Sequence, residues 1–369
     1  MNEEPLRRYR LGDLSVRIDR DLDRAWERCI DEMEASGVPC PLDHRREWLT
    51  RVVGSEARFL SVVDDRGRCR CCFPVRVIRP RSAPGHNVLR VDRFRSSADR
   101  QVSRAALVAL RRFAADSGGT LRAELEEFAS SEQELRCTDA IARKTGFEAR
   151  ERSQLYTHTV VVDLTPDESD IMASFHSSGR RYIREPGKKG FPVRRVHSAE
   201  YASRMAELTS ETFDRTGGNP PERNWTARLD FSRNRPDLYA VFGTFHPDRE
   251  GPRSLLAFVS GCHHGDHVTY ADSASTRRID SNVSLSYAPT WKLMQWGKRH
   301  GAAWFDLGGI PVSDPDEELE GISRFKRYFS TDVRRVRKER VYHARPFRSQ
   351  LSDRIRATAE WTRSLELPV

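Results

Sequence analysis

The chain has 369 residues, of which 37% are hydrophobic and 32% charged, which suits two ordinary domains better than one. Its opening segment is polar and no run approaches the ~20 apolar residues of a membrane span, so we expect a cytoplasmic protein without a membrane partner. Its 63 lysines and arginines outnumber its 54 acidic residues, and the net charge of +9 favours a polyanionic partner such as nucleic acid.

Apolar spacing in the first half predicts helices that alternate with strands. The predicted helices are 20–37, 42–53, 104–117 and 132–145. The predicted strands are 59–63, 69–78 and 121–126. The polar segment 64–67, Asp-Asp-Arg-Gly, separates the first two strands and is typical of a hairpin turn.

The second half shows the fuller pattern. The predicted helices are 167–185, 199–215, 287–300, 321–329 and 347–365. The predicted strands are 157–164, 191–196, 238–245, 254–263, 267–274, 303–307 and 332–342. Pro289 must then lie in the first turn of its helix or mark a kink.

This order of elements resembles that of the GNAT acyltransferase fold, completely in the second half and partly in the first. We therefore expect an α+β protein with two tandem GNAT-like domains, whose mixed and mostly antiparallel sheets are flanked by helices. The expected domains are 1–153 and 154–345, followed by a C-terminal helix at 346–369.

Two clusters of metal-ligand residue types have simpler explanations. Seven cysteines, an odd number in a chain without an export segment, indicate reduced thiols. Strand alternation places Cys69 and Cys71 on one face and Cys72 on the other, and no second cysteine pair provides the usual zinc spacing. The histidines of 261–267, Gly-Cys-His-His-Gly-Asp-His, fit a hairpin turn. We expect no metal and no other cofactor.

The most specific motif occupies 303–329. Residues 304–310 are Trp-Phe-Asp-Leu-Gly-Gly-Ile, and residues 321–329 are Gly-Ile-Ser-Arg-Phe-Lys-Arg-Tyr-Phe. This resembles the Fem family of aminoacyltransferases, in which a strand ending in Asp-x-Gly-Gly-Ile leads into Gly-(hydrophobic)-x-Arg-Phe-Lys-x-x-Phe. The segment 174–184 is also similar to the helix that opens the second domain of that family. The resemblance covers the second half well and the first half in outline.

The resemblance implies an enzyme that moves an amino acid from aminoacyl-tRNA to an amine. That donor is already an activated ester, so the enzyme needs to hold the amine in line and stabilise an oxyanion. The matching lysine of the family is thought to stabilise that oxyanion, which assigns the role to Lys326, with Phe325 shaping the pocket floor. A surface lysine paired with Glu320 or Asp332 is the simpler alternative.

No general base is obvious from the sequence. Asp272 is the candidate we place with the catalytic residues, because it lies near a strand end. Asp306 also lies at a strand end, where it equally suits the cap of the following turn. The candidate substrate-binding residues are Tyr270, Asn282, Tyr287, Asp306 and Gly309.

Basic residues gather at the start of the second half and in the motif. The expected tRNA-binding residues are Arg180, Arg181, Arg184, Lys188, Lys189 and Arg324. Clusters of this kind neutralise phosphates well, although a solvated basic surface is the simpler interpretation. The partners we expect are therefore aminoacyl-tRNA and an amine acceptor, and we expect a monomer.

Two other classes of protein stay open. An acyl-CoA N-acyltransferase of the same fold would bind pyrophosphate with a (Gln/Arg)-x-x-Gly-x-(Gly/Ala) loop, and segments 51–56 and 184–189 each fail its last position. A non-enzymatic RNA-binding module is the other class, but the chain lacks the interleaved strand aromatics of an RRM.

The first half matches cell-wall members of the Fem family poorly. We therefore expect a small amine or peptide-like acceptor, as in antibiotic biosynthesis, with a peptidoglycan precursor as the alternative.

Overall fold

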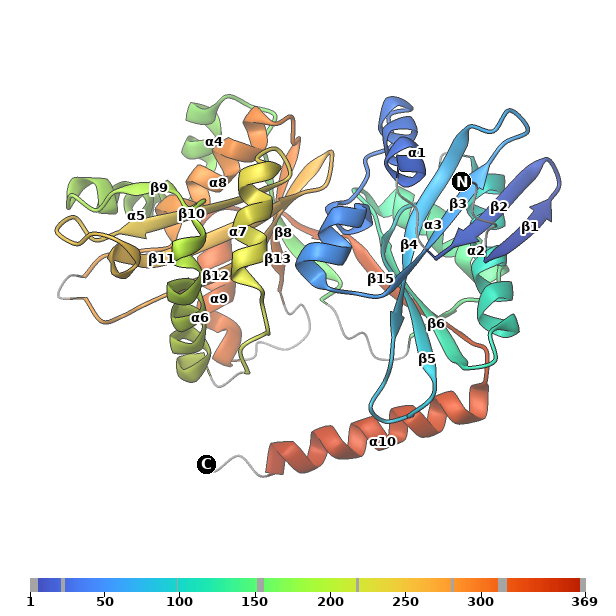
Figure 1. Cartoon of the computed structure of the whole chain (residues 1–369). Helices are drawn as coiled ribbons and strands as arrows, with labels where there is room; N and C mark the ends of the chain where they lie inside the picture. Colours follow the sequence, from blue (N-terminus) through green and yellow to red (C-terminus); the bar gives the residue numbers. More distant parts are fainter. Residues whose placement is uncertain are drawn as a thin grey trace. The chain divides into compact units, whose positions relative to one another are not determined.

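The computed structural model places the chain in two compact units (Figure 1). It describes residues 6–20, 24–97, 99–150, 156–216, 219–279, 282–310 and 317–365. The first unit comprises 1–50, 54–157 and 336–369, and the second comprises 51–53 and 158–335. Within the described ranges, no helix has the length and apolar character needed to cross a membrane.

The first unit is built on an eight-stranded sheet in the order β1-β2-β3-β4-β5-β6-β15-β7. Its strands are β1 (Arg7–Leu11), β2 (Leu14–Asp19), β3 (Ala57–Val63), β4 (Cys69–Ile78), β5 (Asn87–Phe94), β6 (Thr120–Phe128), β7 (Glu148–Ala149) and β15 (Arg337–His343). Its helices are α1 (Arg24–Ala35), α2 (Arg100–Asp116), α3 (Glu132–Lys144) and α10 (Pro346–Leu365). β5 and β6 are parallel, because α2 carries the chain back between them, and the remaining pairs are antiparallel.

The second unit has a seven-stranded sheet in the order β14-β8-β13-β12-β11-β10-β9. Its strands are β8 (His158–Asp163), β9 (Val193–Arg195), β10 (Tyr239–Phe245), β11 (Leu255–His263), β12 (His267–Ser275), β13 (Trp304–Gly309) and β14 (Val333–Arg335). Its helices are α4 (Glu168–Ser174), α5 (Ser177–Lys188), α6 (Ala202–Thr216), α7 (Trp225–Asn234), α8 (Tyr287–Arg299) and α9 (Glu317–Arg327). The predicted fold class, two GNAT-like domains with mostly antiparallel sheets and flanking helices, is confirmed.

The connection from β12 to β13 positions the site described below. The two strands are parallel, so the chain must cross over between them, and the described part of this crossover consists of 276–279, 282–286 and α8. α8 is fixed by its apolar side, since Trp291, Leu293 and Met294 are buried in the core of the second unit. Pro289 is the third residue of α8, which confirms the first-turn alternative.

The structure differs from our domain boundaries at the C-terminal side. We expected the second domain to run to residue 345, with one strand at 332–342. Instead the strand is divided at Val336: β14 pairs with β8 in the second sheet, and β15 pairs with β6 in the first. Alternating apolar residues predict that a segment is extended, but they do not predict which sheet it joins.

Other local differences have identifiable causes. Cys69 and Cys72 share one cluster while Cys71 packs in the main core of the first unit, because a bulge opposite Val62 and Val63 shifts the register of β4. The expected helix 42–53 is a 3₁₀ turn at Leu42–His44 and a π-helical turn at Trp48–Val53.

The predicted helix 167–185 is divided into α4 and α5 at Phe175 and His176, which have extended backbone conformations. The hairpin predicted at 261–267 is confirmed, with the His264 amide donating to the His267 carbonyl at 2.8 Å.

Candidate functional site

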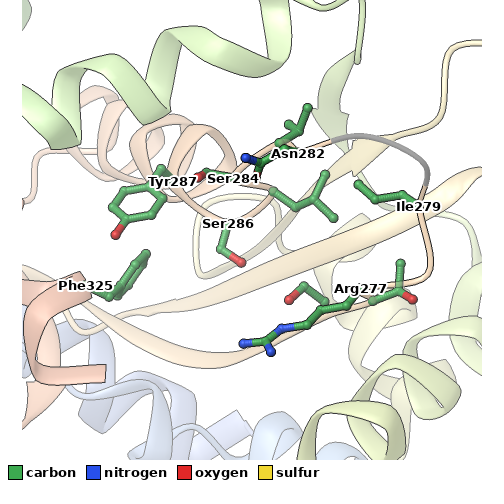
Figure 2. A pocket seen from close by; sticks show the side chains of 11 residues that line it. Arg277, Ile279, Asn282, Ser284, Ser286, Tyr287 and Phe325 are labelled. Carbon is green, nitrogen blue, oxygen red and sulfur yellow. The ribbon is translucent and has the colours of Figure 1, made fainter. Parts of the chain in front are cut away.

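A cavity of about 510 Å³ lies between the end of β12 and the start of α8 (Figure 2). Its lining residues are Ser275, Thr276, Arg277, Ile279, Asn282, Val283, Ser284, Leu285, Ser286, Tyr287 and Phe325. Asn282, Tyr287 and Phe325, which the sequence analysis proposed separately, therefore share one cavity. Its volume falls in the range of ordinary small-molecule sites.

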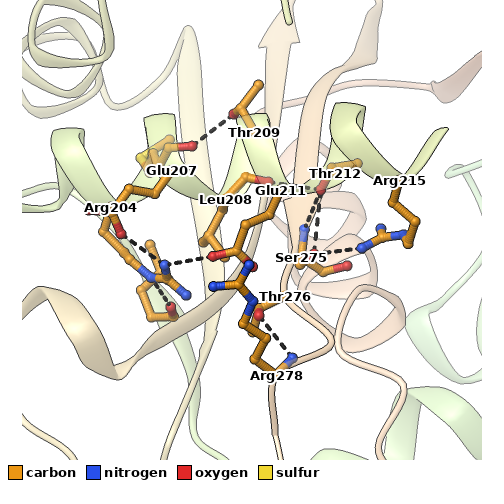
Figure 3. A network of polar contacts seen from close by, with 12 residues as sticks. Arg204, Glu207, Leu208, Thr209, Glu211, Thr212, Arg215, Ser275, Thr276 and Arg278 are labelled. Carbon is orange, nitrogen blue, oxygen red and sulfur yellow. Dashed lines mark hydrogen bonds and ion pairs between the residues drawn. The ribbon is translucent and has the colours of Figure 1, made fainter. Parts of the chain in front are cut away.

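The described residues 276–279 and 282–286, which we call the cavity loop, connect β12 to α8. One end of the cavity loop is held by α6 (Figure 3). The Ser275 amide donates to Thr212 Oγ1 at 3.2 Å, and Arg215 Nη1 donates to the Ser275 carbonyl at 3.5 Å. Glu211 accepts from Arg204 at 3.2 Å. Burial opposes ionisation of Glu211, but hydrogen bonds from Thr276 and Arg204 hold its pKa below the usual value. α6 thus fixes Ser275 and Thr276 at the cavity edge.

The other end of the loop is held by α5. Glu185 Oε2 accepts a hydrogen bond of 3.1 Å from the Ser284 amide. Lys189, just after α5, donates to the Asn282 carbonyl and forms an ion pair of 3.1 Å with Glu185. Lys189 therefore positions the cavity loop, which is a different role from the tRNA contact that we expected; that contact stays a prediction.

Aromatic rings form one wall of the cavity. The ring centroid of Tyr287 lies 4.7 Å from that of Phe325 and 4.9 Å from that of Tyr182. Tyr270 lies 6.2 Å from Phe325. Burial raises the pKa of Tyr270 to about 12, and burial with the neighbouring Tyr328 and Tyr182 also raises the pKa of Tyr287. Both phenols are therefore protonated at neutral pH.

Lys326 lies next to Phe325 on α9, and its side chain is buried. It is 8% exposed and donates a hydrogen bond of 2.5 Å to the Gly309 carbonyl at the end of β13. A Cβ on Gly308 would lie 3.5 Å from the Lys326 nitrogen, and the φ of +84° at Gly308 also favours glycine. Because Lys326 is buried against β13, the surface-lysine alternative does not describe it.

Asp306 fixes the backbone to which Lys326 donates its hydrogen bond. It is fully buried on β13, and its Oδ1 accepts from the Gly308 amide at 2.7 Å and from the Thr159 hydroxyl. These bonds match the turn-capping role that the sequence analysis left open. The prediction that Asp306 and Gly309 contact substrate stays a prediction.

Asp272 lies on β12 with both carboxylate oxygens engaged. Oδ1 pairs with Arg223 Nε and Oδ2 with Arg228 Nη1, each at 3.0 Å, and the Asp272 side chain is 12% exposed. Asp272 is not among the described residues that line the cavity. This geometry favours a structural role, and the catalytic role stays a prediction.

The expected tRNA-binding residues of α5 and α9 differ in their surroundings. Arg180 donates to the carbonyl groups of Ala173 and Phe175, so it fixes the junction between α4 and α5. Arg181 lies 4.8 Å above the Tyr182 ring. The exposed basic residues of this group are Arg181, Arg184, Lys188, Lys189 and Arg324.

Neither segment that approximates a pyrophosphate-binding loop has the required geometry. Residues 184–188 lie inside α5, where backbone N–H groups are used by the helix. Residues 51–53 lie in a π-helical turn rather than at the start of an α-helix.

Sequence reasoning missed the polar residues of the cavity loop. Ser284 and Ser286 line the cavity together with Arg277, and they lie in a segment without helical or strand periodicity. The signal that could have located them is topological: a loop that follows one parallel strand and opens the crossover helix lies at the strand ends where ligands bind.

No family model and no curated sequence matches the chain. Among solved structures, the crystal structure of FemX matches with a TM-score of 0.72, covering 90% of this chain and 99% of FemX at 15% identity. The chain has the fold of FemX. The structure of L-PGS from Bacillus licheniformis matches with a TM-score of 0.52, covering 89% of this chain and 96% of L-PGS at 13% identity. The match to FemX spans both units, so the resemblance inferred from the 303–329 motif is confirmed for the fold of nearly the whole chain.

Proposed function

We propose that the chain is an aminoacyltransferase that moves an amino acid from aminoacyl-tRNA to an amine. The observation that carries the proposal is the position of Lys326, a buried ammonium group beside the Gly308–Gly309 backbone. Its neighbour Phe325 lines the cavity. The FemX fold and the Arg-Phe-Lys motif support the same assignment.

The reaction forms one bond and breaks one. The acceptor nitrogen attacks the ester carbonyl carbon of the donor, and the carbonyl oxygen becomes an oxyanion. The bond to the tRNA ribose oxygen then breaks, and the proton lost by the amine ends on that oxygen. Lys326 would stabilise the oxyanion, since a fixed cation in a water-poor site is worth far more than one in water.

The arrangement of the cavity supports separate paths for the two substrates. Exposed basic residues on α5, which include Arg184 and Lys188, suit the phosphates of the tRNA end. A cavity of about 510 Å³ suits a small amine or a peptide-like intermediate, as in antibiotic biosynthesis. Transfer to a nucleotide- or lipid-linked cell-wall peptide by the purified protein would contradict this choice of acceptor.

A transfer assay tests the proposal. Purified protein is incubated with bulk tRNA charged with radiolabelled amino acids and with a small-molecule extract of the cells from which the protein comes. We expect a labelled amide that ribonuclease treatment of the donor abolishes. Label transfer that resists ribonuclease and requires added acyl-CoA would instead identify an acyl-CoA N-acyltransferase.

A further inference from the structure

The outward side of helix α10 is apolar. Phe347 is 79% exposed, and Leu351 and Ile355 are also exposed. Their spacing of four residues places all three on one side of the helix, in a stripe about 80° wide. Figure 1 shows α10 as one long helix that follows β15. A surface helix normally turns its apolar side to the core and its polar side to water, so α10 has the opposite orientation.

The side of α10 that packs on the first unit is small and polar. Ser349 and Ser352 are buried. Ser349 accepts a hydrogen bond of 3.3 Å from Arg122 and is hydrogen-bonded to His343 at 2.9 Å. Asp353 forms an ion pair of 3.3 Å with the same Arg122. These contacts fix the rotation of the helix, so the apolar stripe cannot turn inward unless they break.

Arginines border the apolar stripe on both edges. Arg348 and Arg354 are exposed, and since each residue turns the helix by about 100°, each lies about 20° beyond one edge of the stripe. The sequence of α10 contains four arginines and two acidic residues, and one of these acids is Asp353, which pairs with Arg122. The stripe and its two border arginines, which we call the α10 surface, therefore combine apolar area with positive charge.

We propose that the α10 surface binds membranes that contain anionic lipids, with the apolar stripe inserted among the headgroups and the border arginines paired with lipid phosphates. Helices that lie in a membrane interface have an apolar side and basic residues beside it, and their affinity grows with buried apolar area and with anionic lipid. Arginine suits the border, because its stem stays with apolar groups while the guanidinium reaches the phosphate.

This inference goes beyond the proposed transfer reaction and does not depend on it. It revises our expectation that the protein has no membrane partner. That expectation came from the lack of a run of ~20 apolar residues, which a spanning helix needs and a helix lying in the interface does not.

The surroundings of α10 favour a flat lipid surface over a protein partner. The turn between β4 and β5 follows one border of the helix, where Ser82 is hydrogen-bonded to Ser352 at 2.7 Å and Arg348 donates to His86 at 3.1 Å. A protein groove that encloses a helix on both sides would meet this turn, whereas a bilayer contacts the outward side alone. A second copy packed on the same stripe would place arginines near arginines, and like charges across an interface oppose association.

Vesicle binding tests the α10 surface without any transfer reaction. The whole protein, without tRNA, is mixed with vesicles of phosphatidylcholine alone or of equal parts phosphatidylcholine and phosphatidylglycerol, and the bound fraction is measured by cosedimentation. We expect binding to the anionic vesicles to be about 25-fold tighter, because each of the two border arginines contributes roughly fivefold near an anionic surface.

Substitutions separate the apolar and the charged contributions. Leu351→Gln should weaken binding to anionic vesicles about tenfold or more, because burial of one such side chain is worth at least that factor. Val333→Gln, which changes an exposed apolar residue on β14, is the matched control and should bind like the parent. The double variant Arg348→Gln, Arg354→Gln should lose about 25-fold on anionic vesicles and bind neutral vesicles as the parent does.

The changed side chains are exposed, so circular dichroism and chemical denaturation should show an unchanged fold in every variant. Equal binding of the parent to the two kinds of vesicle would overturn the proposal, as would unchanged binding of Leu351→Gln. A parent that binds neither kind of vesicle but forms a dimer in solution, which Leu351→Gln dissociates, would also overturn it and assign the stripe to a second copy.

Discussion

Gly179 of α5 lies directly against the backbone of Tyr328, just after α9. A Cβ built on Gly179 would be 2.6 Å from the Tyr328 carbonyl oxygen, and the His176 amide donates to that same oxygen at 3.0 Å. The contact brings α5 and the end of α9 together, and α9 carries Phe325 and Lys326. The glycine is therefore required by close approach rather than by its backbone angles.

Gly179→Ala should reduce the free energy of unfolding by about 1–3 kcal/mol, because backbone atoms cannot move aside as a flexible side chain can. Gly187→Ala is the matched control in the same helix, since no atom lies within 4 Å of its added Cβ. It should leave stability unchanged or raise it by up to about 1 kcal/mol. Chemical denaturation of both variants checks the pair, and an equal effect of the two changes would contradict the close contact.

Removing two exposed charges of α5 should weaken tRNA binding without affecting the fold. For the double variant Arg184→Gln, Lys188→Gln we expect lower affinity for tRNA. The slope of log K against log salt concentration should become less negative by roughly 1.5, because each lost phosphate contact changes it by about 0.7–0.9. Arg249→Gln, an exposed position in the turn between β10 and β11, is the control. An unchanged salt slope in the double variant would place the tRNA elsewhere.

Asp272→Asn separates a structural role from a catalytic one. Because Asp272 neutralises the largely buried Arg228, its loss should lower the free energy of unfolding by about 3 kcal/mol. The transfer rate per folded molecule should stay close to that of the parent. Replacing both Asp272 and Arg228 by leucine should recover stability. A folded Asp272→Asn protein that binds donor but has lost transfer would support the general-base assignment instead.

The phenol of Tyr270 should ionise late in an alkaline titration. Its pKa of about 12 lies above the usual value near 10, so folding favours the protonated form. The resulting stability is complete below pH 10 and is lost as the pH rises through 12. The difference in tyrosinate absorbance between the parent and Tyr270→Phe should therefore rise near pH 12. A midpoint near 10 would contradict the burial of this phenol.

Most elements of the second unit could be predicted from apolar periodicity, because β8, β10, β11, β12 and α8 have strong patterns of their own. The predictions missed β1, β2, β5, β7 and α7. Three of the five residues of β1 are exposed arginines, which hide its apolar pattern, and α7 includes Arg228, a buried cation that pairs with Asp272. Such positions depend on partners that a local pattern does not contain.

The residues of the candidate site also fall into two groups, those that a local sequence pattern predicts and those that only the fold brings together. Phe325, Tyr287 and Asn282 could be found because a specific motif and a strand–loop–helix order pointed to them. Arg277, Ser284 and Ser286 could not, since their segment has no periodicity of its own and only the fold brings them into one cavity with Phe325.

The most direct test of the account is the rate of transfer by Lys326→Ala at saturating aminoacyl-tRNA. Loss of an oxyanion-stabilising group typically costs about 100- to 1,000-fold in kcat, and we expect a loss of that size with donor binding little changed. Lys292→Ala, an exposed lysine on α8, should retain full activity. A Lys326→Ala protein that folds and transfers at the parent rate would contradict the assignment of Lys326 as the catalytic cation.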